Sequence, residues 1–206
     1  AANETGAIMI DTRPQHIFKE AFIPNAIFIG IKGDFAPWVG TLLTDIEQPI
    51  LIIAEEDNRE EVITRLSRVG YDNIIGYLDG GLEAWIKAGK ETDNIESITA
   101  TDFAEKFKET EGKILVKDVR KPTEYSAEHV DEAMNIPLAN LSKNMAEFSK
   151  TEMNYLHCAG GYRSMIAASI LKSRGFDNLI DITGGFAAIS ATDIPKSDFV
   201  CQSKMK

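Results

Sequence analysis

The sequence predicts an α/β protein of two similar domains, and three observations support this prediction. Short apolar runs, typical of strands, alternate with segments that favour helices, as in domains built on mainly parallel sheets. One of these runs, residues 49–54, is apolar without interruption, which is typical of a strand covered on both faces of its sheet. The order of the elements recurs about a hundred residues later, which indicates two homologous domains rather than solenoid repeats. We therefore expect each domain to hold a mainly parallel central sheet flanked by helices on both faces.

The first domain is predicted over residues 1–94. Its expected elements, in chain order, are a strand at residues 7–10, a turn and strand over 22–29, a strand at 49–54, a loop over 55–59, a helix over about 60–69 and an apolar segment at 74–75. Residues 90–94 are polar and are predicted to link this domain to the next.

The second domain, predicted over residues 95–206, repeats this order. It opens with Ile98 and a capped amphipathic helix over residues 99–107. Its further elements are a strand at residues 113–117, a segment over 129–136, a strand that ends at His157 and a helix over 165–172. Only a few residues precede the first strand of the first domain. Counterparts of the opening strand and helix are therefore missing there, and we expect the start of that domain to be truncated.

Composition and charge disfavour several classes of function. The formal net charge is -10 and the sequence pI is about 4.8, whereas nucleic-acid binding selects basic surfaces. No run approaches the roughly 18 apolar residues of a membrane span, and the N-terminus lacks the pattern of a signal peptide. Cys158 and Cys201 are the two cysteines, which is no disulfide framework and favours a reducing, cytoplasmic compartment.

Cys158 is the candidate nucleophile because it stands where a predicted strand stops and a predicted helix begins. Gly160 and Gly161 follow it and allow a tight turn with backbone N–H groups pointing inward. The helix N-terminus adds partial positive charge and Arg163 adds a full one, which together favour the thiolate form. The same groups form a cradle for an anion beside the sulfur. A nucleophilic sulfur and an anion cradle at one place indicate covalent catalysis.

Simpler interpretations stand beside this one. Cys158 could be a small buried apolar residue, as many cysteines are. His157 lies inside a strand and is expected to be packed rather than catalytic, and His16 and His129 are expected at the surface or in turns. The acidic and basic residues that follow the first strand of each domain are expected to pair and brace the loop; they are Asp11 with Arg13 and Asp118 with Arg120. A role for Cys201 as a resolving thiol stays open.

In both halves, the motifs resemble those of the rhodanese, or sulfurtransferase, superfamily. Asp-x-Arg follows the first long strand of each half, and a Gly-Gly ending occurs at residues 80–85 and, in part, at 184–189. The active-site pattern Cys-x-x-Gly-x-Arg-Ser is complete only in the second half. The resemblance implies that Cys158 is catalytic and that the loop residues bind the substrate, namely Ala159, Gly160, Gly161, Tyr162, Arg163 and Ser164. Two alternatives stay open: Ser164 caps the following helix instead of contacting the substrate, and Arg163 serves in part to bind loop carbonyls.

Loop length separates two chemistries of this fold family. Rhodaneses have four residues between the cysteine and the arginine, and related dual-specificity phosphatases and arsenate reductases have five. Four residues separate Cys158 from Arg163, so the resemblance implies transfer of a sulfane sulfur. A phosphatase is the less favoured alternative.

The implied function is a sulfurtransferase that moves a sulfane sulfur from thiosulfate or a low-molecular-weight persulfide to a thiol or cyanide. No cofactor and no metal site is predicted. The first domain has Ala54 where the nucleophile should stand, followed by three acidic residues, so it is expected to be inactive. Tandem units of this kind also resemble the C-terminal part of proteins with an upstream metallo-β-lactamase-fold domain, including persulfide dioxygenase fusions. A regulatory or docking module of such an enzyme is therefore the alternative.

Overall fold

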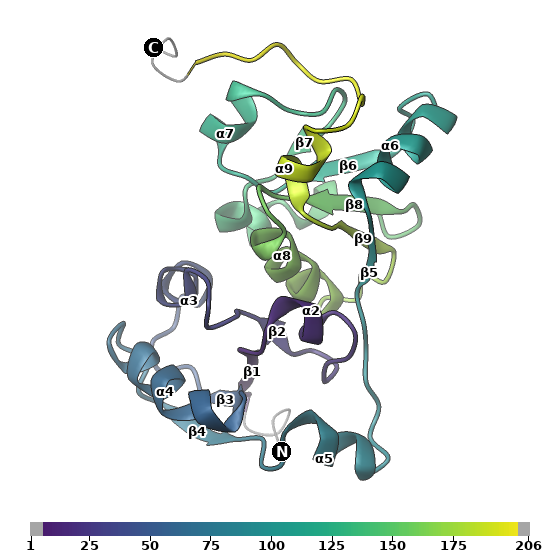
Figure 1. The fold of residues 1–206 in the computed structure, drawn as a ribbon. Coiled ribbons are helices and arrows are strands. Elements are labelled where there is room, and N and C mark those ends of the chain that lie inside the picture. Colours follow the sequence, from purple (N-terminus) through teal and green to yellow (C-terminus); the bar gives the residue numbers. More distant parts are fainter. Residues whose placement is uncertain (1–5, 202–206) are drawn as a thin grey trace. The chain divides into compact units, whose positions relative to one another are not determined.

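The structure, a computed structural model, describes residues 6–201. The chain divides into two compact units (Figure 1). Unit 1 extends to Asn94 and also takes in Lys172–Arg174, and unit 2 comprises Ile95–Leu171 and the residues from Gly175 onward. Each unit contains a parallel sheet with helices beside it. The predicted α/β fold with two parallel sheets is therefore confirmed.

Unit 1 is built on a four-stranded sheet with the strand order β2-β1-β3-β4. All of its strand pairs are parallel. Its elements are β1 (Ile8–Asp11), α2 (Gln15–Phe18), β2 (Ile27–Phe28), α3 (Phe35–Leu42), β3 (Ile50–Ile53), the 3₁₀ helix η1 (Glu56–Asn58), α4 (Arg59–Ser67), β4 (Ile74–Tyr77) and α5 (Gly81–Lys87).

Unit 2 is built on a five-stranded parallel sheet with the order β5-β9-β8-β6-β7. Its elements are β5 (Glu96–Ile98), α6 (Ala100–Glu109), β6 (Leu115–Asp118), α7 (Pro122–Ala127), β7 (Met134–Asn135), the 3₁₀ helices η2 (Leu138–Lys143) and η3 (Met145–Glu147), β8 (Asn154–His157), α8 (Tyr162–Lys172), β9 (Leu179–Ile182) and α9 (Gly185–Ile189). Strands β1, β3 and β4 of unit 1 thus correspond to β6, β8 and β9 of unit 2. Strand β5 and helix α6 have no counterpart among the described residues of unit 1.

The opening helix of unit 2 forms as the sequence predicts. Thr99 is its N-cap, and the Thr99 hydroxyl accepts a hydrogen bond of 3.1 Å from the backbone N–H of Asp102. Phe103 and Phe107, one turn apart, are both buried in a core cluster with Val116 of β6. The helix therefore covers one face of the sheet through an apolar stripe at helical spacing.

Several elements were not predicted. Residues 55–59 were expected to form a loop, but residues 56–58 form the 3₁₀ helix η1 and α4 already begins at Arg59. The helices α2, α3 and α7 have four, eight and six residues, too few for a clear 3.6-residue pattern. Among the helices of the described residues, none is long and apolar enough to cross a membrane.

The strand register brings the candidate nucleophile beside the Asp-x-Arg motif. Strand β6 pairs in parallel with β8, with Asp118 opposite His157. The next residue after His157 is Cys158. Because the carboxyl ends of parallel strands meet at one edge of a sheet, the loops after β6, β8 and β9 converge there.

Candidate active site

The side chain of Cys158 is buried beneath the loop that follows β8. The residue is 1% exposed, and the backbone N–H of Gly161 donates to its Sγ at 3.1 Å. Gly161 has a φ of 106°, a conformation that side chains with a Cβ rarely adopt, so glycine is required for this N–H to point inward. Helix α8 begins at the next residue, Tyr162, so the positive end of its dipole lies beside the sulfur. Both features stabilise negative charge on the sulfur.

The other loop residues differ in their access to solvent. Gly160 is exposed, Ala159 and Tyr162 are partly exposed, and Gly161 is buried. The exposed side of the loop therefore lies at residues 159, 160 and 162, which is where an incoming substrate would approach.

The start of α9, at Gly184 and Gly185, packs against the nucleophile loop. The N–H of Phe186 donates to the carbonyl of Cys158 at 2.6 Å, and the N–H of Ala187 donates to that of Ala159 at 3.0 Å. A Cβ on Gly185 would lie 2.5 Å from the carbonyl oxygen of Cys158, closer than side chains can approach. Gly185 therefore lets the start of α9 pack directly on the nucleophile loop. In the sequence, Gly184 and Gly185 stand out only as the second copy of the Gly-Gly ending. The contact of Gly185 with the carbonyl of Cys158 was not predicted.

Arg163 makes a bidentate ion pair. Its two terminal nitrogens donate to the carboxylate oxygens of Glu124 in α7, at 2.6 and 2.8 Å. These hydrogen bonds raise the pKa of Arg163 and lower the pKa of Glu124. Both side chains are partly exposed, so solvent weakens the pair. The expected contact of Arg163 with an anionic donor stays a prediction, and the observed contact ties the loop to α7.

Glu124 is a further site residue that the sequence did not predict. It also accepts a hydrogen bond of 3.1 Å from the backbone N–H of Lys121, at the start of α7. A proline followed two residues later by a glutamate, as at Pro122 and Glu124, is a signal for a helix start. That signal could have predicted α7, but not the contact with Arg163, which is 39 residues further along the chain.

Ser164 points into the protein and not toward the mouth of the loop. It is fully buried, and its hydroxyl lies 2.6 Å from a carboxylate oxygen of Asp181 in β9 and 2.9 Å from the carbonyl of Gly161. The N–H of Gly161 donates to the sulfur of Cys158. The hydroxyl of Ser164 therefore helps to hold Gly161 in the conformation that presents this N–H. The predicted substrate contact of Ser164 stays a prediction that this geometry does not favour.

The Asp-x-Arg motifs brace both units in the same way. In unit 2, the Arg120 guanidinium binds both carboxylate oxygens of Asp118 and the carbonyl of Glu128. In unit 1, Arg13 makes the equivalent contacts with Asp11 and with Ala21. All four charged residues are buried. The predicted pairing is confirmed, and its role is to hold the turn after the strand.

His157 is packed beside this pair, as the sequence predicted. It is fully buried, its Nε2 lies 3.9 Å from Asp118, and its ring stacks against Phe186. Burial is the main cause that lowers its pKa. The imidazole is therefore neutral at physiological pH and acts as part of the core under Cys158.

The corresponding loop of unit 1 has an arginine at the equivalent position but has no glycine at the position of Gly161. Arg59 stands five residues after Ala54, as Arg163 does after Cys158. The Arg59 guanidinium lies over the ring of Tyr77, 4.2 Å from its centroid. Asp57 takes the place of Gly161 within the 3₁₀ helix η1, and it has no positive φ. Its N–H therefore cannot point inward as that of Gly161 does.

The remaining candidates lie away from this site. His16 is exposed, and His129 is partly buried and stacks on Tyr125. Cys201 is exposed. Within residues 6–201, no group of three or more His, Cys, Asp or Glu side chains is arranged to hold a metal ion.

Comparisons with known proteins identify the family to which the two units belong. The family model of the rhodanese-like domain matches residues 1–88 and again residues 99–192. The uncharacterized protein YqhL of Bacillus subtilis is 33% identical over 91 residues, which cover 44% of this chain and 72% of that protein. A protein of Allochromatium vinosum named sulfurtransferase is 25% identical over 101 residues, or 49% of this chain and 94% of that protein.

Among solved structures, one similar chain is the thiosulfate sulfurtransferase of Pseudomonas aeruginosa. The match covers 94% of this chain and 41% of that one, at 19% identity and a TM-score of 0.45. The two sequence relatives each match about half of this chain, which is close to the length of one unit.

Proposed function

The chain belongs to the rhodanese-like domain family, and from that premise we propose that it is a sulfurtransferase in which Cys158 of unit 2 carries the sulfur. The observation that carries the proposal is the hydrogen bond from the N–H of Gly161 to the sulfur of Cys158, at 3.1 Å. A backbone donor aimed at a buried sulfur stabilises a thiolate before the reaction, and the transferred sulfur after it.

The proposed reaction has two displacement steps. The Cys158 thiolate attacks the outer sulfur of thiosulfate, a new S–S bond forms, and sulfite leaves with the electron pair of the old S–S bond. A thiolate or cyanide then attacks the terminal sulfur of the Cys158 persulfide. The bond to the Cys158 sulfur breaks, its electron pair returns to Cys158, and the thiolate is restored. No external oxidant, reductant or cofactor is needed.

The donor is proposed to be thiosulfate or a low-molecular-weight persulfide rather than a phosphate ester. Four residues, Ala159 to Tyr162, separate the nucleophile from Arg163, and the sulfur is already bound by one loop N–H. A loop of four residues is the length found in rhodaneses, whereas the related phosphatases have five residues between the cysteine and the arginine.

The test is intact-protein mass spectrometry after exposure to thiosulfate and, separately, to glutathione persulfide. We expect one added sulfur that cyanide removes. The Cys158→Ser variant should gain none, and the matched Cys201→Ser variant should load as the unmodified protein does. Equal loading of Cys158→Ser would disprove the assignment of the sulfur carrier.

A docking or regulatory module is the second candidate, favoured by the exposed side chains of Ile75 and Tyr77 on β4 of unit 1. In this case Cys158 would relay sulfur to, or sense it for, a larger enzyme, such as one with a metallo-β-lactamase-fold domain. Turnover separates the two candidates, because a docking module would load sulfur once but show no catalytic turnover with either donor.

A further inference from the structure

Unit 1 has a cavity at the edge of its sheet that corresponds to the edge where unit 2 carries the nucleophile. The cavity has a volume of about 600 Å³, and it is lined by residues that follow β1, β3 and β4. Ala54, at the nucleophile position, is among them. Ligands of parallel α/β sheets bind outside the carboxyl ends of the strands, and small-molecule sites usually have volumes of about 300–1,000 Å³. The position and the size of this cavity therefore suit a small ligand.

Arg59 lines this cavity and lacks the carboxylate partner that its counterpart Arg163 has in unit 2. Glu124 binds Arg163 through two hydrogen bonds. The Asp-x-Arg motifs align α2 with α7, and this alignment puts Ile17 at the position of Glu124. The Nε of Arg59 is buried and has no hydrogen-bond partner among the described residues. Because a buried donor without an acceptor is costly, this nitrogen is suited to bind an anionic oxygen of a ligand.

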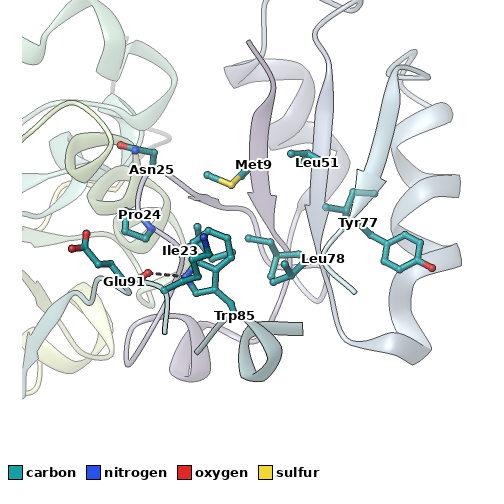
Figure 2. Close-up of a pocket in the computed structure, with 12 residues that line it drawn as sticks. Met9, Ile23, Pro24, Asn25, Leu51, Tyr77, Leu78, Trp85 and Glu91 are labelled. Atoms are coloured by element: carbon teal, nitrogen blue, oxygen red, sulfur yellow. Dashed lines mark hydrogen bonds between the residues drawn. The ribbon is translucent and has the colours of Figure 1, made fainter. Parts of the chain in front are cut away.

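Packing on an aromatic ring holds Arg59 in place. Its guanidinium lies over the ring of Tyr77, 4.2 Å from the centroid, and Figure 2 shows that this ring extends away from Trp85. Arginine can stack on a ring and still donate hydrogen bonds in its own plane. The other arginine that lines the cavity, Arg13, is already bound to both carboxylate oxygens of its Asp-x-Arg partner. Of these two arginines, Arg59 is therefore the one suited to a carboxylate of a ligand.

The same cavity also presents negative charge. Four acidic residues line it, namely Glu55, Glu56, Asp79 and Glu83. Glu55 accepts a hydrogen bond of 2.9 Å from Asn58, and Glu83 lies 4.0 Å from Lys87. Within residues 6–201, the carboxylates of the other two have no hydrogen-bond or ion-pair partner. A simple anion would be repelled by these groups, so the complementary ligand carries a positive charge as well as a negative one.

The wall of the cavity is partly apolar. Ile17 and Ile86 line it and are 39% and 51% exposed, and Leu82 lines it as well. An apolar part of a ligand would remove these side chains from water, which is favourable. In unit 2, the positions of Ile17 and Ile86 are taken by the polar residues Glu124 and Ser190. The apolar wall is therefore a feature of unit 1 and not of the fold.

From these observations we propose that unit 1 binds a small apolar zwitterion of the amino-acid or short-peptide class, with a free carboxylate and a free ammonium group. The carboxylate accepts hydrogen bonds from Arg59, the ammonium group donates to Glu56 and Asp79, and the apolar side chain covers Ile17 and Ile86. This binding involves no thiol and goes beyond the sulfur transfer proposed for unit 2.

The test uses the full chain and the dipeptide L-leucyl-L-leucine. Calorimetric titration should give a dissociation constant of about 0.1–1 mM, as expected for a ligand of this size. The N-acetylated dipeptide and the dipeptide amide each lack one charge. Both should bind at least about tenfold more weakly, because each loses charge-assisted hydrogen bonds. Amide shifts in NMR spectra should change at residues 54–59 and 79–86, and the Cys158→Ser protein should bind the dipeptide equally well.

Two pairs of variants identify the groups that bind. Ile17→Glu restores the carboxylate partner of Arg59, so it should weaken dipeptide binding at least about tenfold and remove the preference over the amide. Ile63→Glu is the matched variant, because Ile63 is also 39% exposed and lies outside the cavity lining. Asp79→Asn should reduce the preference over the acetylated form, whereas Asp72→Asn, at an exposed position outside the lining, should keep it. Thermal unfolding checks that all four variants fold.

Four results would overturn the proposal. The first is no binding of the dipeptide up to about 10 mM, a concentration at which even weak specific sites fill. The second is equal binding of the dipeptide and its two blocked forms, which would mean that the charges are not recognised. The third is equal binding by the Ile17→Glu and Ile63→Glu proteins. The fourth is loss of binding in Cys158→Ser, because the dipeptide would then occupy the site of unit 2.

Discussion

The loops after β3 and β8 follow corresponding strands of the two sheets but differ in backbone conformation and in the residue at the nucleophile position. Both follow a central strand, both are five residues from the nucleophile position to an arginine, and both lie beside a buried Asp–Arg pair. In unit 2, Gly161 aims its N–H at the sulfur of Cys158. In unit 1, Asp57 at the same position is part of a 3₁₀ helix. The difference shows that the site depends on backbone conformation as much as on the cysteine.

The largest expected effect comes from moving the nucleophile into unit 1. The double variant Ala54→Cys with Cys158→Ser should lose turnover with thiosulfate and with glutathione persulfide by at least about a hundredfold, the scale seen when a preorganised donor is removed from an anion site. Glu55 and Glu56 beside residue 54 would also repel an anionic donor. Turnover close to that of the unmodified protein would show that the cysteine alone makes the site. The Cys201→Ser variant is the control for loss of a thiol.

The second expected effect comes from Gly185, which packs on the nucleophile loop of unit 2 and whose counterpart Gly81 makes no such contact in unit 1. Gly185→Ala should lower turnover by up to about a hundredfold, because its Cβ would press on the carbonyl of Cys158 and shift the loop. Gly81→Ala is the matched variant: its φ is also positive, but a Cβ there meets nothing within 4 Å. It should cost about 1–2 kcal/mol of unfolding free energy from backbone strain and leave turnover unchanged. Equal turnover in both variants would contradict the proposed support.

A smaller effect is expected from the two arginines. Arg163→Lys should lower turnover about tenfold, because an ammonium group cannot make the bidentate contact with Glu124. Arg59→Lys, the same change in unit 1, should leave turnover as it is. Steady-state kinetics with thiosulfate measure both. If the two variants behave alike, Arg163 neither positions the loop nor binds the donor.

The smallest effect is a pH dependence of stability that only unit 2 should show. His157 stands where unit 1 has Ile53, and burial holds its pKa below the ordinary value of 6.5. Between pH 6.5 and this lower pKa, the unfolded chain takes up a proton that the folded chain does not, so stability falls as the pH falls. Asp118, whose negative charge opposes this shift, and Arg120 are the charged groups that face the ring.

The His157→Ile variant tests this expectation. Its unfolding free energy, measured by urea denaturation between pH 7 and pH 5, should depend less steeply on pH than that of the unmodified protein. The difference in slope should be at most about 1.4 kcal/mol per pH unit, the limit for one proton. His16→Gln, at an exposed position, is the control and should keep the slope. An unchanged slope in His157→Ile would mean that another group causes it.

The sequence by itself was enough for the features that depend on neighbouring residues. Alternating apolar runs and their recurrence predicted two parallel α/β units, and the Thr99 cap and the apolar spacing of residues 103 and 107 predicted α6. The glycines after Cys158 predicted a tight turn before α8. These features are local because capping, helical periodicity and positive φ values involve residues a few positions apart.

Only the tertiary structure decided which distant residues meet at the site. Glu124 reaches Arg163, Asp181 reaches Ser164, and Gly185 packs on the carbonyl of Cys158. Their separation along the chain leaves no periodic signal, because these contacts are set by strand register and by helix packing. The same holds for exposure. Ile75 and Tyr77 of β4 are about half exposed, whereas all four residues of β9 are buried, and only the packed sheets distinguish the two strands.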